Sequence, residues 1–594
     1  MTAPEADPAF VKRLHGAAEV LLGKTTIVCS DTPGFIANRV GCFWMAAAAL
    51  EARRLGLDVE TADAVNAALG IPRTGVFGLF DLVGIDLVPT VWGSLLDALP
   101  NTDALHRFDV TSDPVFRTLV EHGAFGRKAG AGFYRKSSDG MREVLDLETL
   151  EYRPQHDPAP LPGGGAGALI ADQNPVGAYA RAVLSEVLAY ATTHAPDIAT
   201  DAGAIDTAME LGYSWRKGPF ALAESVGLEA VARSLPEIPA FLERGISEGF
   251  YANGAPLATT GGRAVSIGNA PLANRKVIAS NAFATVHDLD DGVACFRAHT
   301  KMNTFDPGVF EMLEETLDRA GKDFDALVLA NDDPRAFSAG ADLSFFMRMV
   351  DSPDGPAQIN AYGKRGQGLF MRMYRTPVPV VAAVHGFALG GGCEFQMHAD
   401  ATVAHAEANI GLPETGVGLV PGWGGCTRLY ARAYAADPEA GPVDLAKRAF
   451  ATLFSGKVSG SAAEAEALGL LRPTDEIVMH RAHLIEAAKA RALALVAGYV
   501  PPVPLELPVA GPAGKGEILA AAHADLAAGK ITETDLALAD TLAGILTGGP
   551  DARETVMEAD MMALEAATLA RLVTWQPARA RVEHMLATGK RLRN

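Results

Sequence analysis

The sequence has few cysteines, no excess of basic residues and no long apolar run, and each shortage excludes a class of protein. Its five cysteines include no C-x-x-C pair, which excludes a disulfide framework and the usual zinc spacing and is typical of reduced thiols in the cytosol. The formal net charge of −20 argues against nucleic acid as a general partner, because phosphate binding needs a basic surface. The longest apolar run, residues 41–50, is half as long as a membrane span, and residues 1–7 lack the features of a signal peptide. We therefore expect a cytoplasmic protein with no membrane span.

The chain is long enough for several domains. At 594 residues it exceeds the size at which a single core stops growing, about 250–300 residues. Its first half contains an internal repeat: residues 39–70 can be laid over residues 181–212 without a gap, and similar motifs follow in both places after one inserted residue. Each copy reads as a long helix, a second helix ending at glycine, a short loop and another helix. Between the copies, Gly163-Gly164-Gly165 neither follows a strand nor matches G-x-G-x-x-G, which favours a linker over a nucleotide loop.

Two motifs mark the ends of the first copy. Residues 31–40, D-T-P-G-F-I-A-N-R-V, read as a capped helix start with proline where its missing N–H costs nothing, and residues 126–134 read G-R-K-A-G-A-G-F-Y. These strings resemble the beginning and the end of the C-terminal domain of 3-hydroxyacyl-CoA dehydrogenases. In that family the residue matching Asn38 helps hold the catalytic histidine and the substrate, whereas the second copy has Ala180 at that place. The resemblance implies a role for Asn38, and two copies packed as in the dimers of simpler relatives.

The same resemblance implies a cofactor whose site the sequence does not show. Dehydrogenases of that family bind NAD in a Rossmann domain that precedes this point and carries the catalytic His–Glu pair. Upstream of Asp31 there is neither a strand–G-x-G-x-x-G–helix fingerprint nor a candidate His–Glu motif. NAD is thus expected for the parent dehydrogenase and not for this chain, either because the sequence is truncated or because the helical part survives as a scaffold. We predict that this polypeptide alone does not oxidise a 3-hydroxyacyl-CoA, and appreciable NADH formation would refute that prediction.

From about residue 281 the pattern changes to short apolar strands alternating with helices, an α/β signature. Residues 326–330 and 378–384 read as buried strands, each followed by a glycine-bearing loop. The first loop is A-F-S-A-G-A-D at residues 336–342, and the second is H-G-F-A-L-G-G-G-C-E at residues 385–394. Three glycines before a helical run let a ligand approach the backbone, where exposed N–H groups face it with the positive end of the helix dipole. A thioester oxygen that gathers negative charge needs such paired donors.

The two loops are followed by a third motif, G-L-P-E-T-G-V-G-L-V-P-G-W-G-G at residues 411–425. In this order and spacing the three resemble the enoyl-CoA hydratase, or crotonase, family. Carried over by position, the resemblance implies oxyanion-hole N–H groups at Ala341 and Gly391 and catalytic carboxylates at Glu394 and Glu414. Adding water across a C=C bond requires such a pair, because two carboxyl groups can hold one water between them, one acting as base and the other supplying a proton.

The end of the chain completes the domain prediction. After the extended stretch P-P-V-P at residues 501–504, an alanine-rich helical periodicity predicts amphipathic helices that cap the preceding domain or form a docking surface. The predicted fold class is multidomain: duplicated all-α 3-hydroxyacyl-CoA dehydrogenase C-terminal domains, then an α/β crotonase domain and C-terminal helices. The predicted boundaries are 1–136 for the first helical domain, 137–167 for the linker, 168–270 for the second copy, 271–500 for the crotonase domain and 501–594 for the C-terminal helices.

The predicted function is hydration of trans-2-enoyl-CoA to 3-hydroxyacyl-CoA by a protein that resembles fused enzymes of fatty-acid β-oxidation. An acyl-CoA thioester is the expected substrate, and hydration itself needs no cofactor. The resemblance also leaves room for a thiolase partner and for an oligomer. Two alternatives stay open: a double-bond isomerase, which can manage with one carboxylate, and a non-catalytic module that docks a thiolase or a separate NAD domain. The presence of both glutamates favours the hydratase.

Overall fold

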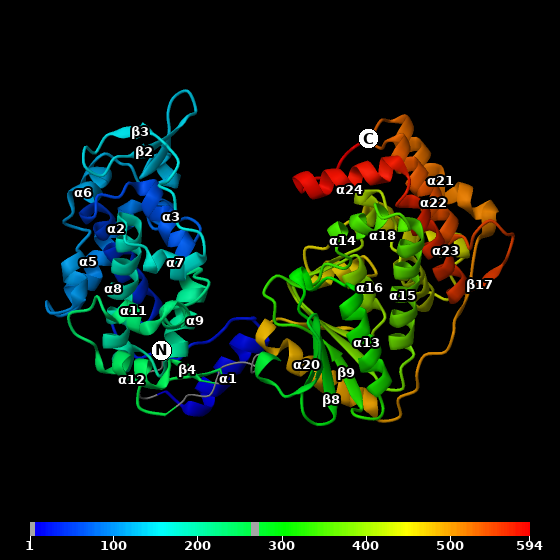
Figure 1. Ribbon diagram of the computed structural model, residues 1–594, viewed down its shortest axis with the longest axis horizontal. Helices are drawn as coiled ribbons and strands as arrows, with labels where there is room; N and C mark the ends of the chain where they lie inside the picture. The colour runs from blue at the N-terminus through cyan, green and yellow to red at the C-terminus, as the bar shows by residue number, and fades with distance from the viewer. Residues whose placement is uncertain (1–5, 253, 263–271) are drawn as a thin grey trace. The chain divides into compact units, whose positions relative to one another are not determined.

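The computed structural model describes residues 6–252, 254–262 and 272–594 (Figure 1). The chain divides into two compact units. The helical unit comprises Met1–His15 and Thr26–Ile267, and the sheet unit comprises Gly16–Thr25 and Gly268–Asn594. Helix α1 (Pro8–Val20) spans the first of these divisions, so that a short piece of N-terminal chain belongs to the sheet unit. There the hydroxyl of Thr25 and the Nε2 atom of His480 are 2.9 Å apart.

The helical unit consists of two groups of helices, each with short antiparallel strands. The first group contains α2 (Ala37–Arg54), α3 (Val59–Leu69), α4 (Phe77–Val83), η1 (Ile85–Leu87), α5 (Val88–Ala98), η2 (Ala104–Phe108), α6 (Pro114–Glu121), η3 (Arg127–Ala129), β1 (Tyr134–Lys136), β2 (Arg142–Leu145) and β3 (Tyr152–Pro154). The second contains α7 (Gly165–Ala171), α8 (Pro175–Ile198), α9 (Ala202–Tyr213), α10 (Pro219–Val226), α11 (Leu228–Ala232), α12 (Ala240–Glu248), β4 (Tyr251–Ala252) and β5 (Ala255–Pro256). The long helices α2 and α8 pack together, with the ring of Phe43 stacked on that of Tyr190 at 3.8 Å between centroids.

A buried carboxylate joins three elements of the first group. Asp63 on α3 accepts hydrogen bonds from the N–H groups of Phe77 and Gly78 on α4, at 2.8 and 3.0 Å. It also accepts one from the hydroxyl of Tyr134 on β1, at 2.8 Å. These bonds satisfy N–H groups that the first turn of α4 leaves without helical partners.

The second group repeats this arrangement. Asp206 on α9 accepts hydrogen bonds from the N–H groups of Phe220 and Ala221 on α10, at 2.9 and 2.8 Å. The hydroxyl of Tyr251 on β4 donates to the same carboxylate at 2.7 Å. The two groups therefore share a hydrogen-bond pattern as well as a similar sequence.

These hydrogen bonds correct the register of the internal repeat. The ungapped overlay of residues 39–70 on residues 181–212 pairs Asp63 with Ile205, whereas the equivalent carboxylate is that of Asp206, one residue later. The overlay is wrong here because similarity between alanine-rich helices does not define a register to one residue.

The segment predicted as a linker, residues 137–167, is not structureless. Strand β2 lies between β1 and β3 in an antiparallel sheet, and Val144 and Leu145 of β2 are buried. Four residues are too few for an apolar alternation to show in a proline-rich segment. Within the predicted linker, residues 155–164 contain no helix or strand.

The sheet unit is built on a seven-stranded sheet in the order β15-β13-β11-β9-β8-β7-β6. Strands β6, β7 and β8 pair antiparallel, and the pairs from β8 to β15 are parallel. The strands of the unit are β6 (Val277–Ser280), β7 (Ala284–Asp288), β8 (Val293–Ala298), β9 (Ala326–Leu329), β10 (Ala336–Ser338), β11 (Val380–Val384), β12 (Phe387–Leu389), β13 (Ala401–His405), β14 (Asn409–Gly411), β15 (Glu476–Val478), β16 (Glu506–Pro508) and β17 (Thr555–Met557). Because side chains alternate along a strand, Val293 and Cys295 face one core cluster while Ala294 and Phe296 face another.

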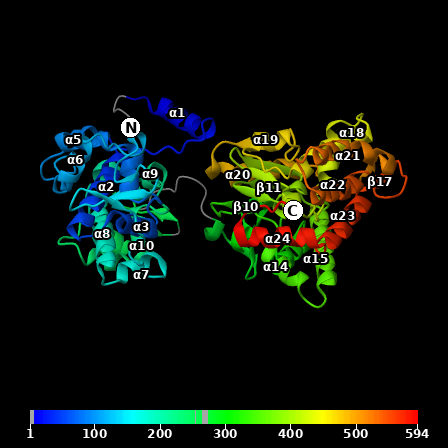
Figure 2. The same ribbon diagram turned by 90° about the horizontal axis from the view of Figure 1, so that it is seen from above.

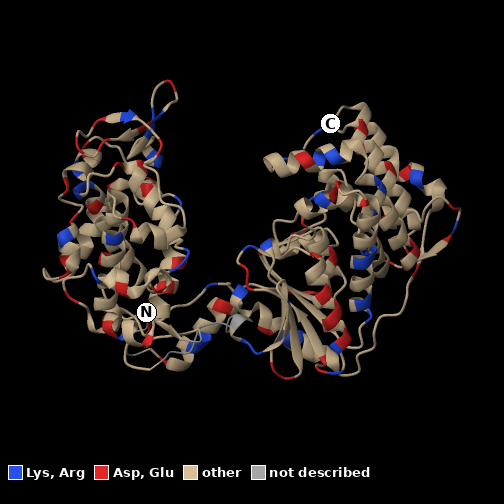
Figure 3. Ribbon diagram, in the orientation of Figure 1, with Lys and Arg blue, Asp and Glu red and all other residues tan. Residues whose placement is uncertain are grey.

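Helices cover both faces of this sheet. The helices of the unit are η4 (Leu272–Asn274), η5 (Lys301–Asn303), α13 (Pro307–Arg319), α14 (Leu343–Val350), α15 (Gly355–Tyr374), α16 (Gly391–Met397), η6 (Glu414–Val417), α17 (Gly425–Ala436), α18 (Pro442–Ser455), α19 (Ala462–Ala467), η7 (Arg481–His483), α20 (Leu484–Val496), α21 (Gly511–Ala527), α22 (Glu533–Leu546), α23 (Glu558–Leu572) and α24 (Gln576–Thr588). Helix α20 packs on one face against β9, β11 and β13. On the other face, acidic α13 lies beside basic α15 (Figure 3), and Arg365 pairs with Glu314 at 3.3 Å.

The helices after residue 501 are not a separate layer. Leu519, Leu542 and Leu572 belong to the same hydrophobic core as the sheet and α15. Helix α24 lies over α14 (Figure 2), with Arg579 and Asp351 joined by an ion pair of 2.7 Å. This region therefore completes the core of the sheet unit.

Among the described residues, no single helix is long and apolar enough to span a membrane. The bent pair formed by Phe77–Val83 and Ile85–Ala98 has the length and apolar composition of a span only when its two helices are counted together.

Candidate active site

Two glycine-bearing loops meet where the small parallel sheet β10-β12-β14 ends. Gly340 follows β10 and has a φ of +78°, and a Cβ atom placed on it would lie 2.6 Å from the nitrogen of Gly391. Gly392 is equally constrained, because a Cβ atom there would lie 2.1 Å from the carbonyl oxygen of Ser338. Only glycine allows this approach. Among the described residues, the N–H groups of Ala341 and Gly391 donate to no other backbone group, and both residues line one cavity.

Both predicted catalytic glutamates line the same cavity, which has a volume of about 380 Å³. Glu394 lies on α16 one turn after Gly391, is 2% exposed, and accepts hydrogen bonds at one oxygen from the N–H groups of Trp423 and Gly425, at 2.7 and 2.8 Å. Glu414 begins η6, and its Oε2 atom is buried without a hydrogen-bond partner. The structure thus brings together all four residues predicted for this site in the sheet unit.

Burial makes both carboxyl groups reluctant to ionise. It raises the pKa of Glu394 to about 7, against two N–H groups that lower it. Burial, followed by the charge of Glu394, raises the pKa of Glu414 well above its ordinary value. Two close carboxyl groups lose their protons in two steps that belong to the pair. The two N–H groups stabilise the ionised form at Glu394, so the first proton lost by the pair comes from Glu394 and the remaining one is favoured at Glu414.

The remaining wall of the cavity is mostly apolar, with Arg591 as a charged member, and includes residues that sequence analysis missed. Trp423 follows the third motif's proline, and its ring would lie 2.3 Å from a Cβ atom on Gly391. Leu569 and Met585 come from α23 and α24, far from the motifs in the sequence. Also on α23, Glu565 is fully buried beside the loop that carries Trp423. The sequence did offer a signal for Glu565, since a glutamate among the apolar residues of one helix face is unusual. Helical periodicity alone, however, does not identify the groups that would hydrogen-bond to it.

Two family models match parts of the chain. Residues 34–136 match the 3-hydroxyacyl-CoA dehydrogenase C-terminal domain, and residues 291–494 match the enoyl-CoA hydratase/isomerase model. A probable 3-hydroxyacyl-CoA dehydrogenase of Bacillus subtilis is 32% identical over 622 residues, which cover 99% of this chain and 78% of that protein. The chain belongs to the family of fused 3-hydroxyacyl-CoA dehydrogenase and enoyl-CoA hydratase proteins. The sheet unit is accordingly its crotonase domain.

Two further proteins are similar to parts of the chain. A putative fatty acid oxidation complex trifunctional enzyme of Rickettsia prowazekii is 34% identical and covers 69% of this chain. The chain spans 57% of the length of that protein. An enoyl-CoA hydratase structure from Bacillus anthracis is 20% identical, with a TM-score of 0.31 over 52% of this chain and 97% of that one.

The fifth predicted site residue, Asn38, lies in the helical unit, near the start of α2, and its side chain is exposed. Its neighbour Arg39 is buried and forms a 2.5 Å ion pair with Asp103. The hydroxyl of Tyr190 accepts a further hydrogen bond from Arg39 at 2.5 Å. These contacts fix the start of α2 but show no ligand at Asn38, whose catalytic role stays a prediction.

The helical unit does not fit NAD. A dinucleotide site of the Rossmann type needs parallel strands with a glycine-rich turn leading into a helix. In the described part of the helical unit the strands are short antiparallel pairs, and the glycine run at residues 163–165 leads from an irregular segment into the seven-residue helix α7. No step of a reaction is assigned to NAD here.

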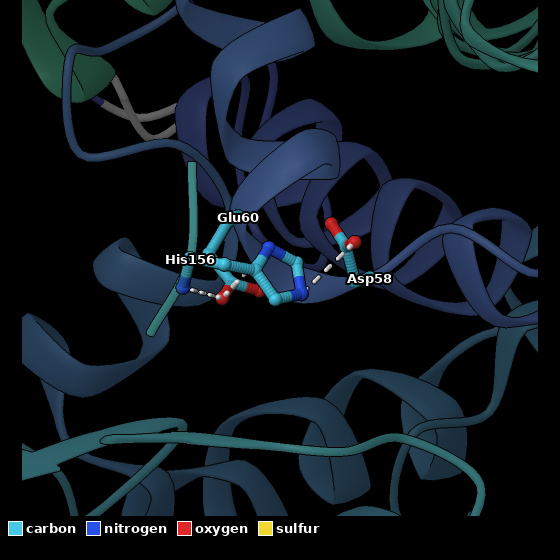
Figure 4. A group of neighbouring side chains, drawn as sticks. All are labelled: Asp58, Glu60 and His156. Carbon is cyan, nitrogen blue, oxygen red and sulfur yellow. Dashed lines mark hydrogen bonds and ion pairs between the residues drawn. The ribbon is translucent and has the colours of Figure 1, made fainter. Parts of the chain in front are cut away.

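One group of side chains has the spacing of a cation site. Oxygen atoms of Asp58 and Glu60 and a ring nitrogen of His156 lie within 4.8 Å of one another (Figure 4). The guanidinium of Arg153, however, donates to both oxygens of Glu60, at 2.7 and 2.8 Å. Because this cation already neutralises the buried carboxylate, the group is a clamp between β3 and α3 and not a metal centre.

Proposed function

We propose that the crotonase domain adds water to trans-2-enoyl-CoA thioesters and releases 3-hydroxyacyl-CoA. One observation carries the proposal: two carboxyl groups with raised pKa values, Glu394 and Glu414, face one cavity beside the N–H groups of Ala341 and Gly391. The relatives named for fatty acid oxidation support a substrate of this class. The domain needs no cofactor for this reaction, because only a water molecule and two proton transfers are involved.

The two N–H groups and the two carboxyl groups have different roles in the reaction. The thioester oxygen binds at the N–H groups of Ala341 and Gly391, which stabilise the negative charge that gathers on it during addition. Glu394, the carboxylate favoured by two N–H donors, takes a proton from water, and the hydroxide adds to the β-carbon. Glu414, the carboxyl group with an oxygen lacking any protein partner, gives its proton to the α-carbon. The proton taken by Glu394 returns to Glu414 through solvent before the next turnover.

The test is loss of the ultraviolet absorbance of the conjugated thioester in crotonyl-CoA. We expect Glu394→Gln and Glu414→Gln each to lower kcat by roughly 10²–10⁴, the usual contribution of a positioned acid or base. Glu407→Gln is the matched control, because Glu407 is an exposed glutamate between the two in sequence. No turnover by the wild type with short or long enoyl chains would contradict the proposal and leave a docking module in its place. Double-bond migration that survives Glu394→Gln would favour an isomerase.

The helical unit is proposed to contain two copies of one domain. The support is the sequence repeat together with two equivalent hydrogen-bond networks, one centred on the carboxylate of Asp63 and one on that of Asp206. Only the first copy falls within residues 34–136, the range matched by the dehydrogenase model. A thiolase partner, oligomer formation and a cytoplasmic location stay predictions from the sequence.

A further inference from the structure

A third buried carboxylate lies beside the proposed catalytic pair. Glu565 on α23 is fully buried, and its two oxygens accept hydrogen bonds from a single loop. The N–H of Gly424 donates at 3.0 Å and that of Thr427 at 2.6 Å, and the hydroxyl of Thr427 donates as well. Burying a carboxylate costs several kcal/mol unless its hydrogen bonds are satisfied, so such a residue in a helix core calls for an explanation.

The loop is shared between two carboxylates. Glu394 accepts from the N–H groups of Trp423 and Gly425, and Glu565 accepts from those of Gly424 and Thr427. The donors thus alternate along the chain at the start of α17, where the helix dipole favours negative charge. The consecutive N–H groups of Trp423, Gly424 and Gly425 thus end on the two carboxylates in turn.

We propose that Glu565 is a positioning residue for hydration: by holding Gly424 and Thr427 it aims the N–H groups of Trp423 and Gly425 at Glu394. The C-terminal helices then complete the active site and do more than fill the core. This inference rests on the proposed function, since it assigns Glu394 a catalytic role. The contact itself, between α23 and the loop, can be measured without any turnover.

The charge of Glu565 also acts on the proposed catalytic pair. Glu394 and Glu414 face it from α16 and η6, and its charge raises the pKa of Glu414. The neighbouring Cys426 thiol and His398 imidazole stay uncharged, because burial raises the pKa of the first and lowers that of the second to about 3. Burial, followed by the charge of Glu394, raises the pKa of Glu565 itself to about 8, so its charge is present on the alkaline side of the profile. Removing that charge should therefore lower the pKa of Glu414 and move the alkaline limb of the pH profile of hydration toward lower pH.

The experiment compares Glu565→Gln, Glu565→Ala and a control on the same helix. Glu558 is also fully buried on α23, and it pairs with Arg428 of α17 at 3.2 Å without touching the loop's N–H groups. Glu558→Gln thus weakens the same helix–helix contact and leaves the loop's acceptors in place. Glu565→Gln keeps the size of the side chain but offers only one oxygen acceptor.

Two measurements on the 594-residue chain test whether Glu565 positions the loop. In Glu565→Gln we expect faster amide hydrogen exchange in the peptide covering residues 422–428, and a kcat on crotonyl-CoA roughly 10–100-fold lower with KM within about threefold. The alkaline limb of the pH profile, which reports loss of the Glu414 proton, should move down in Glu565→Gln and stay unmoved in Glu558→Gln, however much the control lowers the unfolding temperature. Glu565→Ala should lose more activity than Glu565→Gln.

Each other result overturns the inference. Unchanged exchange in the loop would mean that Glu565 does not hold it. Faster exchange with wild-type kcat and pH profile would make the contact structural only. Wild-type protein that does not hydrate any enoyl-CoA would remove the proposed function, while the exchange measurement would still report whether the loop is held.

Discussion

Glu414 carries the least compensated polar atom of the site. Its Oε2 atom is buried and has no hydrogen-bond partner among the described residues, and burial and the charge of Glu394 both raise its pKa. Such a group destabilises the folded protein once it ionises, which is a common cost of a catalytic carboxyl group. The raised pKa means that the folded protein holds this proton more tightly than the unfolded chain does.

We therefore predict that Glu414→Gln, although its kcat falls by roughly 10²–10⁴, is more stable than the wild type at alkaline pH. Below the ordinary pKa of the unfolded glutamate both states are protonated, so the advantage is absent; it grows as the pH rises from that value toward the raised pKa of the folded state and levels off above it. The expected gain is about 1–2 kcal/mol at about pH 9 and near zero at about pH 4. Thermal unfolding at the two pH values measures it. A gain that is equal at both pH values would show that the charge is not its cause.

Sequence analysis reached the residues of the site that lie in motifs and missed those that do not. Ala341, Gly391, Glu394 and Glu414 are close to glycines or prolines whose spacing is set by loop geometry, and the structure places all four on one cavity. Glu565 comes from a helix whose apolar spacing predicts burial but no partner. Which loop a distant helix meets is decided by packing, which periodicity does not encode.

At the scale of elements, two equivalent hydrogen-bond networks, each centred on a buried aspartate, connect the helices and strands of the helical unit. Asp63 fixes the start of α4 and the hydroxyl of Tyr134, and Asp206 does the same for α10 and Tyr251. Burial raises the pKa of both carboxyl groups to about 7, despite the N–H and hydroxyl donors that lower it. Each aspartate satisfies three donors that would otherwise be buried without acceptors.

Asp63→Ala should destabilise the helical unit by about 2–4 kcal/mol, because each buried donor left without an acceptor costs about 1–3 kcal/mol. Asp206→Ala should lower the free energy of unfolding by a similar amount if the two hydrogen-bond networks are equivalent. The control is Asp97→Ala, because Asp97 is exposed on α5. Chemical denaturation followed by circular dichroism gives the free energies. A loss below about 0.5 kcal/mol for Asp63→Ala, the size of a neutral surface change, would show that the hydrogen-bond network around Asp63 does not stabilise the helical unit.

The elements themselves show where patterns suffice. The buried strands predicted at residues 326–330 and 378–384 are confirmed as β9 and β11, which pair parallel. The short strand β2 was missed, and the repeat was misaligned by one residue at Asp63. Long apolar runs and turn residues identify elements, whereas the pairing of short strands and the register of alanine-rich helices depend on contacts distant in sequence.

For the whole molecule, the separation of hydrophobic cores matters most. The core of the helical unit contains residues 36–257, and the two core clusters of the sheet unit contain residues 272–582. No buried residue is shared between these sets within the described chain. That the chain contains more than one compact unit could be predicted from its length, but the inclusion of the last helices in the crotonase core could not, because it depends on tertiary packing.

Separate cores predict two unfolding transitions that respond to different substitutions. In a calorimetric scan, Asp63→Ala should lower the midpoint of one transition by roughly 5–15 °C, the shift expected for a loss of about 2–4 kcal/mol in a domain of this size. It should leave crotonyl-CoA hydration at the wild-type rate. Glu414→Gln should move only the other transition, upward at about pH 9, and lower the kcat of hydration by roughly 10²–10⁴. A single transition that shifts with both substitutions would mean that the two cores unfold as one cooperative unit, and the assignment of hydration to the crotonase domain alone would then need testing by other means.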